Sequence, residues 1–243
     1  MRSEPPFGER SPHLDRCALR APAKAVAVGF TDSRAKLQSK LRELGATQSD
    51  HPASASQITV NLAIARIDLE AAAFLLESLY AEHGYRVSRL DPSPASDVIL
   101  VARQRGEAVG TLTLRADGPA GLRADESYGV ELAGVRALGR RACELSRFAV
   151  AGNAAAIRAL FGFAYRIVRE VWESTDVFIE VNPRHVAFYC RVFGFAVAGG
   201  ERTCARVLAR SVLLRLEVAA FEARVRAPGG RAMSLLMGRP ALN

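Results

Sequence analysis

The sequence contains no apolar run that approaches the roughly 20 residues of a membrane span, because arginines interrupt stretches such as residues 212–214 within a few positions. It also lacks a secretory signal, since the first ten residues carry prolines and glutamates but no apolar core. Neither CxxC nor CxxH spacing links the four cysteines, Cys17, Cys143, Cys190 and Cys204. This favours reduced thiols over a zinc site or a disulfide framework. We therefore expect a cytoplasmic protein without a bound metal.

Several catalytic signatures are missing as well. The chain has no GxSxG elbow, Walker loop, Rossmann glycine triplet or HExxH pair, so hydrolases, kinases and dehydrogenases lose their usual sequence support. His185 is distant from the other histidines, at positions 13, 51 and 83, and nothing marks it as a metal ligand.

The chain does have enough apolar material for one packed domain with extensions. Of 243 residues, 49% are hydrophobic and 24% are charged, which is ordinary for a globular protein. Residues 1–55 carry several prolines and few aromatics, and we interpret them as a mostly disordered or loosely attached extension. The ordered domain is expected at residues 56–220, followed by a basic extension at residues 221–243.

The net charge of +8 is unevenly distributed. From Glu201 to Asn243 the chain carries eight arginines against three glutamates, a net charge of +5. Such a segment can attract an anionic lipid surface or an acidic protein, and it equally fits solvated side chains in an arginine-rich chain. Aromatic residues do not alternate with these arginines as a stacking platform requires, so nucleic acid is not expected as a partner.

The order of the predicted elements indicates a mixed α/β sheet rather than a continuous βα alternation. Strands are expected at residues 58–67, 98–103, 108–115, 142–150 and 176–181, with two more between residues 195 and 218. Helices are expected at residues 68–83, with Asp68 as the cap, and at residues 128–138, 153–173 and 185–193, with a loop at 118–126.

The most informative segment runs from the strand at residues 142–150 into the following helix. The strand leads through Gly152 to Asn153, a typical helix N-cap. The first backbone amides of a helix have no intrahelical partner and can hold an anion or polarise a carbonyl. The same pair is also an ordinary turn and cap, so it does not define a site by itself.

Glu144 and Arg147 lie three residues apart in this strand. The odd spacing places them on opposite faces, so we do not expect them to pair. Apolar neighbours flank Glu144, and such a setting can desolvate the carboxylate, raise its pKa and make it a base for an ammonium nucleophile. The alternative is an ordinary salt bridge from Glu144 to Arg140 or Arg141.

A second informative segment, residues 182–195, carries Tyr189 and His185 on a predicted helix. Tyr189 can protonate a leaving thiolate as a general acid, with packing in the core as the alternative. His185 lies in the first turn of the helix, where a neutral imidazole and a capping role are both open.

Three blocks of the sequence together resemble one enzyme family: GTLTLRADGPAGLRADESY at residues 110–128, ELSRFAV at 144–150 and NPRHVAFYCRVFGF at 182–195. They are similar to the N-acyl amino acid synthases of the FeeM type, which are related to acyl-homoserine-lactone autoinducer synthases and belong with the GNAT acyltransferases. ELSRF by itself is shared with the autoinducer synthases, whereas the other two blocks favour the FeeM type. The resemblance covers about residues 58–218.

The resemblance implies a GNAT fold, with a mixed central sheet that splays at residues 142–150 and is flanked by helices. It implies transfer of a long-chain acyl group from the phosphopantetheine thioester of acyl carrier protein to the α-amine of an amino acid, with no tightly bound cofactor. Glu144 would be the base and Tyr189 the acid, while Arg147 or His185 would bind the carboxylate of the acceptor. Main-chain groups would hold the pantetheine and the thioester carbonyl at Phe148, Ala149, Val150, Gly152 and Asn153.

The resemblance also implies an apolar tunnel for the acyl chain. Ordinary core packing explains its candidate wall residues equally well; these are Phe161, Phe163, Tyr165 and Trp172. Acyl carrier proteins are strongly acidic, so the C-terminal arginines are the predicted docking surface. Peripheral contact with a membrane stays open.

The chain departs from related families at two places. The GNAT acyl-CoA loop, Q/R-x-x-G-x-G/A, is replaced by AGNAAA after Val150. Because that loop holds a pyrophosphate, its loss favours carrier protein over acyl-CoA as the donor. Autoinducer synthases typically carry arginines where this chain has Leu76 and Thr113, which disfavours lactone synthesis. Two other functions stay open: an acetyltransferase that uses acetyl-CoA on another small amine, and a non-catalytic module that binds an acyl chain or a carrier protein.

Overall fold

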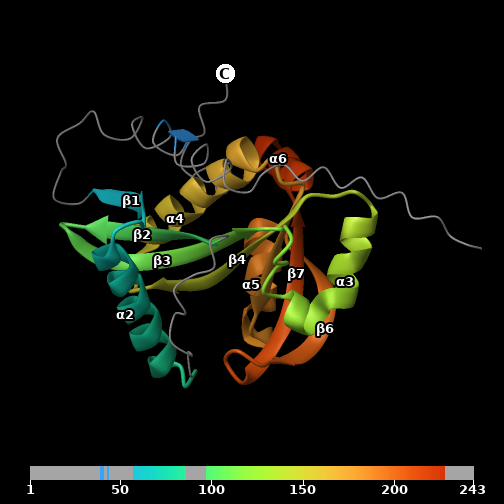
Figure 1. Ribbon diagram of the computed structural model, residues 1–243, viewed down its shortest axis with the longest axis horizontal. Helices are drawn as coiled ribbons and strands as arrows, with labels where there is room; N and C mark the ends of the chain where they lie inside the picture. Colours follow the sequence, from blue (N-terminus) through green and yellow to red (C-terminus); the bar gives the residue numbers. More distant parts are fainter. Residues whose placement is uncertain (1–38, 41–42, 44–56, 86–96, 228–243) are drawn as a thin grey trace, which may run out of the picture.

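The computed structural model describes residues 39–40, 43, 57–85 and 97–227 (Figure 1). Almost all of the predicted N-terminal extension and most of the predicted C-terminal one lie outside these residues. The described chain forms a seven-stranded mixed sheet in the order β1-β2-β3-β4-β5-β7-β6, with helices on both faces. The predicted α/β class is confirmed.

The predicted order of strands and helices is also confirmed. The strands are β1 (Ile58–Leu62), β2 (Asp97–Gln104), β3 (Glu107–Ala116), β4 (Ala142–Val150), β5 (Asp176–Val181), β6 (Ala196–Cys204) and β7 (Ala209–Glu217). The helices are α2 (Arg66–Glu82), α3 (Asp125–Ala137), α4 (Ala154–Arg166), the π-helical turn η1 (Ile167–Val171), α5 (Pro183–Phe193) and α6 (Val218–Arg226).

The sheet divides at β4. This strand pairs antiparallel with β3 along most of its length, as far as Val150, but it pairs in parallel with β5 only from Ala142 to Glu144. Beyond Glu144, the edge of β4 that faces β5 has no strand partner in the described chain. Figure 1 shows α5 between β4 and the upright β7. The predicted splay at this strand is therefore confirmed.

Hydrophobic clusters lie on both faces of the sheet: two that contain β5 and β7 residues, and a small third one formed by Ala72, Ile99 and Val101. Side chains alternate along a strand, so Val177 and Leu214 enter the larger core, which includes buried residues of α4, α5 and α6. Their neighbours Phe178 and Leu213 enter the smaller core, which is formed with α3. This alternation places α3 on one face of β5 and β7, with α4 and the buried end of α5 on the other.

Helix α2 begins two residues before the predicted start. Its N-cap is Ala65, which provides no side-chain hydrogen bond, and the preceding strand ends at Leu62 rather than at residue 67. Asp68 lies inside the first turn, where a carboxylate is favourable to the helix dipole, and it accepts a hydrogen bond from Arg103 at 2.7 Å. The prediction that Asp68 is the cap is therefore wrong.

Three further boundaries differ from the sequence prediction. Helix α3 starts at Asp125, inside the segment predicted as a loop. The helix predicted at residues 153–173 is α4 followed by the π-helical turn η1. Helix α6 was not predicted, and the expected domain boundary at residue 220 falls inside it. Its Phe221 is only 4% exposed, so the packed domain reaches at least Arg226.

Candidate active site

Glu144 is the last residue of β4 that pairs with β5, and its side chain is completely buried. Its Oε2 accepts hydrogen bonds from the backbone N–H groups of Arg123, at 2.5 Å, and Ala124, at 3.1 Å. Its Oε1 has no hydrogen-bond partner among the described residues. A buried, unpartnered carboxylate oxygen is costly, and such groups often mark function.

The environment of Glu144 raises its pKa to about 7. Burial is the main cause, because it disfavours the charged form; the Ala124 N–H and the Arg206 guanidinium oppose the rise. The alternative of a salt bridge to Arg140 or Arg141 is wrong, because those arginines pair with other carboxylates on β5 and before it. A carboxyl group with a pKa near 7 is well matched to general-base catalysis at neutral pH.

Arg147 breaks the alternation of β4. Its backbone φ is 50°, and the register with β3 shifts between Thr111 and Thr113, as at a β-bulge. Arg123 and Arg206 act electrostatically on both Glu144 and Arg147, so the two β4 side chains lie beside the same groups. The prediction that they lie on opposite faces is wrong, because simple alternation does not hold across a bulge.

The Arg147 guanidinium lacks an anionic partner in the described chain. Its Nη1 is buried without a hydrogen bond. Burial lowers the pKa of Arg147 to about 10; Arg123 contributes to this, and Asp97 opposes it. A guanidinium in this state is suited to bind a carboxylate, which would form charge-assisted hydrogen bonds to it.

A network of ion pairs surrounds these two side chains. Asp97 is fully buried and accepts hydrogen bonds from Arg115, at 2.6 Å, and from Arg123. Arg206 pairs with Glu126 at 2.9 Å and also with Glu180. Sequence reasoning assigned no role to Arg123, and it placed Arg206 only among the arginines of the predicted docking surface. The signal for Arg123 was its position inside the block at residues 110–128.

Tyr189 lies half-buried on α5 and packs against aromatic side chains, with its ring centroid 6.0 Å from that of Phe193 and 5.9 Å from that of Phe195. Its burial raises its pKa. The sequence analysis assigned no role to Tyr80 of α2. Its pKa is raised chiefly by burial and next by Tyr189, with Arg147 opposing. The structure thus brings Tyr189, Tyr80 and Arg147 together, although they come from three different elements.

His185 shares helix α5 with Tyr189. It is exposed in the first turn of α5, and its Nε2 is 3.1 Å from the Nε of Arg184. Burial, Arg184 and His83 lower its pKa. His185 is not among the groups that act most strongly on Glu144 or Arg147.

The residues predicted to hold pantetheine follow Arg147 directly. Phe148 packs against Phe161 with ring centroids 5.2 Å apart. The Gly152 N–H donates to the carbonyl of Val150, so this amide is engaged within the turn. The Asn153 side chain accepts hydrogen bonds from the second and third amides of α4, at 3.0 and 3.1 Å, and so caps this helix as predicted.

An apolar cavity of about 40 Å³ lies under the point where β4 and β5 separate. Its lining includes Leu145, Val177, Phe161 and Tyr165. Two of the four predicted tunnel residues therefore line it. Phe163 is buried elsewhere in the larger core.

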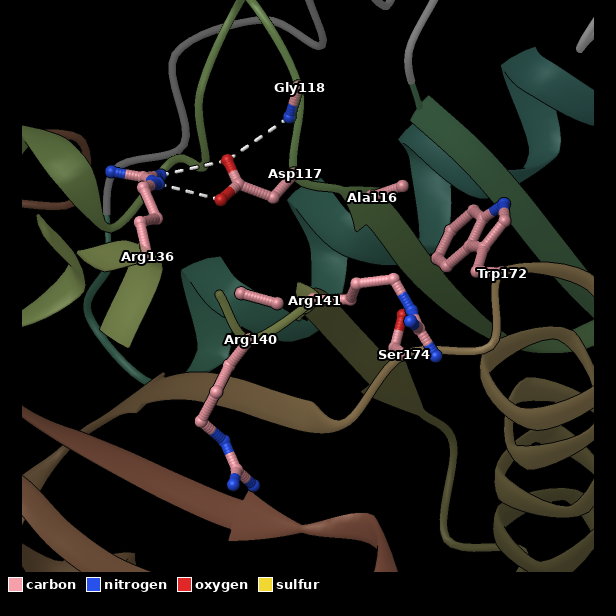
Figure 2. A pocket seen from close by; sticks show the side chains of 9 residues that line it. Ala116, Asp117, Gly118, Arg136, Arg140, Arg141, Trp172 and Ser174 are labelled. Carbon is pink, nitrogen blue, oxygen red and sulfur yellow. Dashed lines mark hydrogen bonds and ion pairs between the residues drawn. The ribbon is translucent and has the colours of Figure 1, made fainter. Parts of the chain in front are cut away.

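Trp172, the fourth predicted tunnel residue, lines a different cavity of about 390 Å³ at the start of β4 (Figure 2). Arg136 points into this space and is held by Asp117, with its Nε 2.6 Å from the carboxylate. Arg140 and Arg141, at its edge, also have acidic partners. Within the described ranges, no group of histidine, cysteine or acidic side chains is arranged to hold a metal ion, and no helix is long and apolar enough to cross a membrane.

The mixed sheet, split at β4 with a buried carboxylate at the split, has the fold of the GNAT acyltransferases. The family model of the N-acyl amino acid synthase FeeM matches residues 71–217, more than half of the chain, and the chain belongs to this family. It is thus an N-acyltransferase rather than a non-catalytic binding module. No curated protein sequence matches this chain.

Solved structures agree on the fold. FeeM, an N-acyl amino acid synthase from uncultured soil microbes, is 24% identical, with a TM-score of 0.63 over 69% of this chain and 93% of FeeM. The AHL synthase LasI is 17% identical, with a TM-score of 0.53 over 67% of this chain and 91% of LasI. Both similarities are similarities of fold.

Proposed function

We propose that this enzyme transfers a long-chain acyl group from acyl carrier protein to the α-amine of an amino acid. The observation that carries the proposal is the pair of unpartnered groups at the bulge of β4: Oε1 of Glu144 and Nη1 of Arg147. An α-amino acid presents an ammonium group for the first and a carboxylate for the second. A simple amine would leave Nη1 of the half-buried Arg147 side chain without a partner in the described chain.

The free edge of β4 supports the choice of donor. Between Leu145 and Val150 this edge lacks a strand partner, so its backbone groups can pair with the amides of a pantetheine arm. We assign this role to Phe148, Ala149 and Val150, with Gly152 and Asn153 at the following turn. A carrier-bound pantetheine needs no pyrophosphate loop, which agrees with AGNAAA after Val150. No tightly bound cofactor is required, and we place the reaction in the cytoplasm.

The proposed reaction proceeds by direct attack. Oε1 of Glu144 removes a proton from the ammonium group, and the free amine then attacks the thioester carbonyl carbon. The tetrahedral intermediate collapses as the new C–N bond persists and the C–S bond breaks. As the intermediate collapses, its positively charged nitrogen releases its second proton to solvent, and Tyr189 protonates the leaving thiolate. Tyr189 then regains a proton from solvent, and Glu144 returns its proton to solvent. A raised pKa keeps Tyr189 protonated until the thiolate forms.

The acyl chain is assigned to the apolar cavity beneath the split. Its volume of about 40 Å³ holds a short acyl group without movement, and a long chain requires the rings of Phe161 and Phe193 to separate. The small volume of the cavity also favours a second candidate function, the transfer of a short acyl group from acetyl-CoA to a small amine. His185, exposed on α5, is the alternative contact for the acceptor.

Mass spectrometry of lipid extracts tests the proposal. Cells that express the wild-type chain are compared with cells that express Glu144→Gln at equal soluble levels. We expect new N-acyl amino acids only in the wild type, and their masses give acceptor and chain length together. If soluble wild-type protein yields no new species and the purified enzyme acetylates amines from acetyl-CoA, the second candidate replaces the first.

A further inference from the structure

In the described part of the chain, up to Ala227, the arginines near the C-terminus do not form the free basic patch that the sequence predicts. Among the six in the described chain, five pair with carboxylates. These pairs are Arg202–Glu131, Arg206–Glu126, Arg210–Glu201, Arg215–Asp176 and Arg226–Glu222. The sixth, Arg224, donates instead to the carbonyl of Arg191 at 2.7 Å. Most of this positive charge is therefore neutralised within the fold.

Exposed arginines without acidic partners in the described chain gather on α5. Arg184, Phe188 and Arg191 occupy positions i, i+4 and i+7, which share one side of a helix. All three are exposed, and Phe188 is 49% exposed despite its apolar ring. Arg224 reaches the C-terminal end of the same helix. We call these four side chains the α5 face.

The two segments that supply helix α5 and the free edge of β4 carry charge of one sign. Residues 145–169 and 181–200 contain no aspartate or glutamate, and these segments supply the free edge of β4 and helices α4 and α5. Helices α2 and α3, by contrast, carry seven acidic residues: Asp68, Glu70, Glu77, Glu82, Asp125, Glu126 and Glu131. The acid-free segments therefore include both the free edge of β4 and the helix that carries Tyr189.

We propose that the α5 face is the docking surface for acyl carrier protein; this rests on the proposed function. Phe188 lies beside Tyr189, with ring centroids 5.4 Å apart, and Tyr189 is the proposed acid for the leaving thiolate. A carrier bound to the exposed side of α5 would deliver its pantetheine arm next to that hydroxyl. The docking surface and the site of thioester cleavage thus share one helix turn.

The composition of the α5 face fits a small acidic protein. Interfaces are enriched in arginine and aromatic residues, with an apolar contact at the centre and charges around it. Here Phe188 lies between Arg184 and Arg191, so acidic side chains of a carrier helix can pair on both sides of it. Such charge complementarity speeds association and makes it sensitive to salt.

The test compares two donors that carry the same acyl group, one on acyl carrier protein and one on free pantetheine. The double variant Arg184→Glu/Arg191→Glu should raise KM for the carrier-bound donor about tenfold or more at low salt. KM for acyl-pantetheine should stay unchanged, because that donor does not touch the α5 face. The matched control is Arg66→Glu/Arg210→Glu, which makes the same charge change at exposed residues elsewhere and should leave both KM values unchanged.

Other outcomes overturn the assignment. If KM rises equally for both donors, the α5 arginines act on the shared site; if neither changes, the carrier docks elsewhere. Binding of holo carrier protein to immobilised enzyme decides the matter without turnover, so failure of the proposed reaction is distinguishable from failure of the docking surface. Loss of binding to phosphatidylglycerol vesicles with unchanged carrier binding would assign the face to a membrane instead.

Discussion

The Glu144 carboxylate is held by two backbone N–H groups on one oxygen, while the other oxygen faces a site without a protein partner in the described chain. Glu144→Gln keeps the shape and can keep both accepted hydrogen bonds through its carbonyl oxygen, but it cannot take a proton. We expect kcat to fall about 10²–10⁴-fold, the usual contribution of a general base.

The wild-type rate should also rise with pH and level off above about 7, where Glu144 is ionised. Initial rates of both enzymes across pH 5.5–8.5 give the loss in kcat and the pH dependence of the wild-type rate. A Glu144→Gln enzyme with full turnover at every pH would remove Glu144 from the role of base.

The same carboxyl group makes stability depend on pH. Its pKa is about 7 in the folded chain and 4.5 as the reference value, so the folded state binds the proton more tightly. The stabilising contribution is complete below pH 4.5 and is lost as pH rises through 7. Glu144→Gln should therefore gain about 2–3 kcal/mol over wild type at pH 8 relative to pH 5.

Urea unfolding at pH 5 and pH 8 measures this difference. Glu107→Gln, at an exposed residue of the β2–β3 hairpin, is the matched control and should give the same difference from wild type at both pH values. A Glu144→Gln effect equal at both pH values would contradict the raised pKa.

Arg147→Gln separates acceptor binding from acyl transfer. Removing a guanidinium that pairs with a carboxylate costs about 2–5 kcal/mol when the pair is desolvated. KM for the amino acid acceptor should therefore rise at least about tenfold, while an acceptor amine that lacks the carboxylate should be used equally by both enzymes. Steady-state kinetics with an amino acid and its decarboxylated amine checks this. Equal losses on both acceptors would mean that Arg147 supports the fold of the bulge instead.

At the scale of elements, close packing between α3 and β6 depends on Gly199. A Cβ there would lie 2.5 Å from Cδ1 of Tyr128, and Tyr128 is fully buried, with its hydroxyl donating to the Ser211 carbonyl at 2.9 Å. Gly199→Ala should cost about 1–3 kcal/mol of stability through overpacking. Gly200→Ala is the control, because its Cβ would meet nothing within 4 Å. Equal urea midpoints for the two variants would refute this packing account.

Local patterns in the sequence predict most of the elements, because strands and long helices have clear periodicity. The bounds of β4 agree with the prediction at both ends. Helix α6 was missed because it has only nine residues and its arginines mask the buried Phe221. The faces of Glu144 and Arg147 were mispredicted because a bulge depends on pairing with β3, which a single strand pattern does not reveal.

The candidate site, too, was predicted only in part from the sequence. Glu144, Arg147 and Tyr189 were found in motif blocks, but Tyr80 was assigned no role and Arg206 was placed only in the predicted docking surface. These two come from α2 and the β6–β7 turn, far from β4 in sequence, and only the tertiary fold brings them to the site. No local pattern marks such a residue, because its role comes from neighbours that lie at long sequence separation.

On the scale of the whole molecule, the positive charge is not concentrated in one C-terminal region. The net charge of +8 suggested a basic C-terminal region, yet most of those arginines are paired within the fold. Arg147, Arg184 and Arg191, which lack acidic partners in the described chain, lie instead in the acid-free segments at 145–169 and 181–200. The opening in the sheet at β4 thus combines a free strand edge, an apolar cavity and a basic rim, which are the features a carrier-bound acyl thioester requires.

The most direct test of the central claim uses purified enzyme, a long-chain acyl carrier protein and a mixture of amino acids, with products read by mass spectrometry. We predict an amide-linked N-acyl amino acid, acylated at the α-amine, that is absent with Glu144→Gln. Acylation only of amines that lack a carboxylate, or transfer only of a short acyl group from acetyl-CoA, would contradict the account.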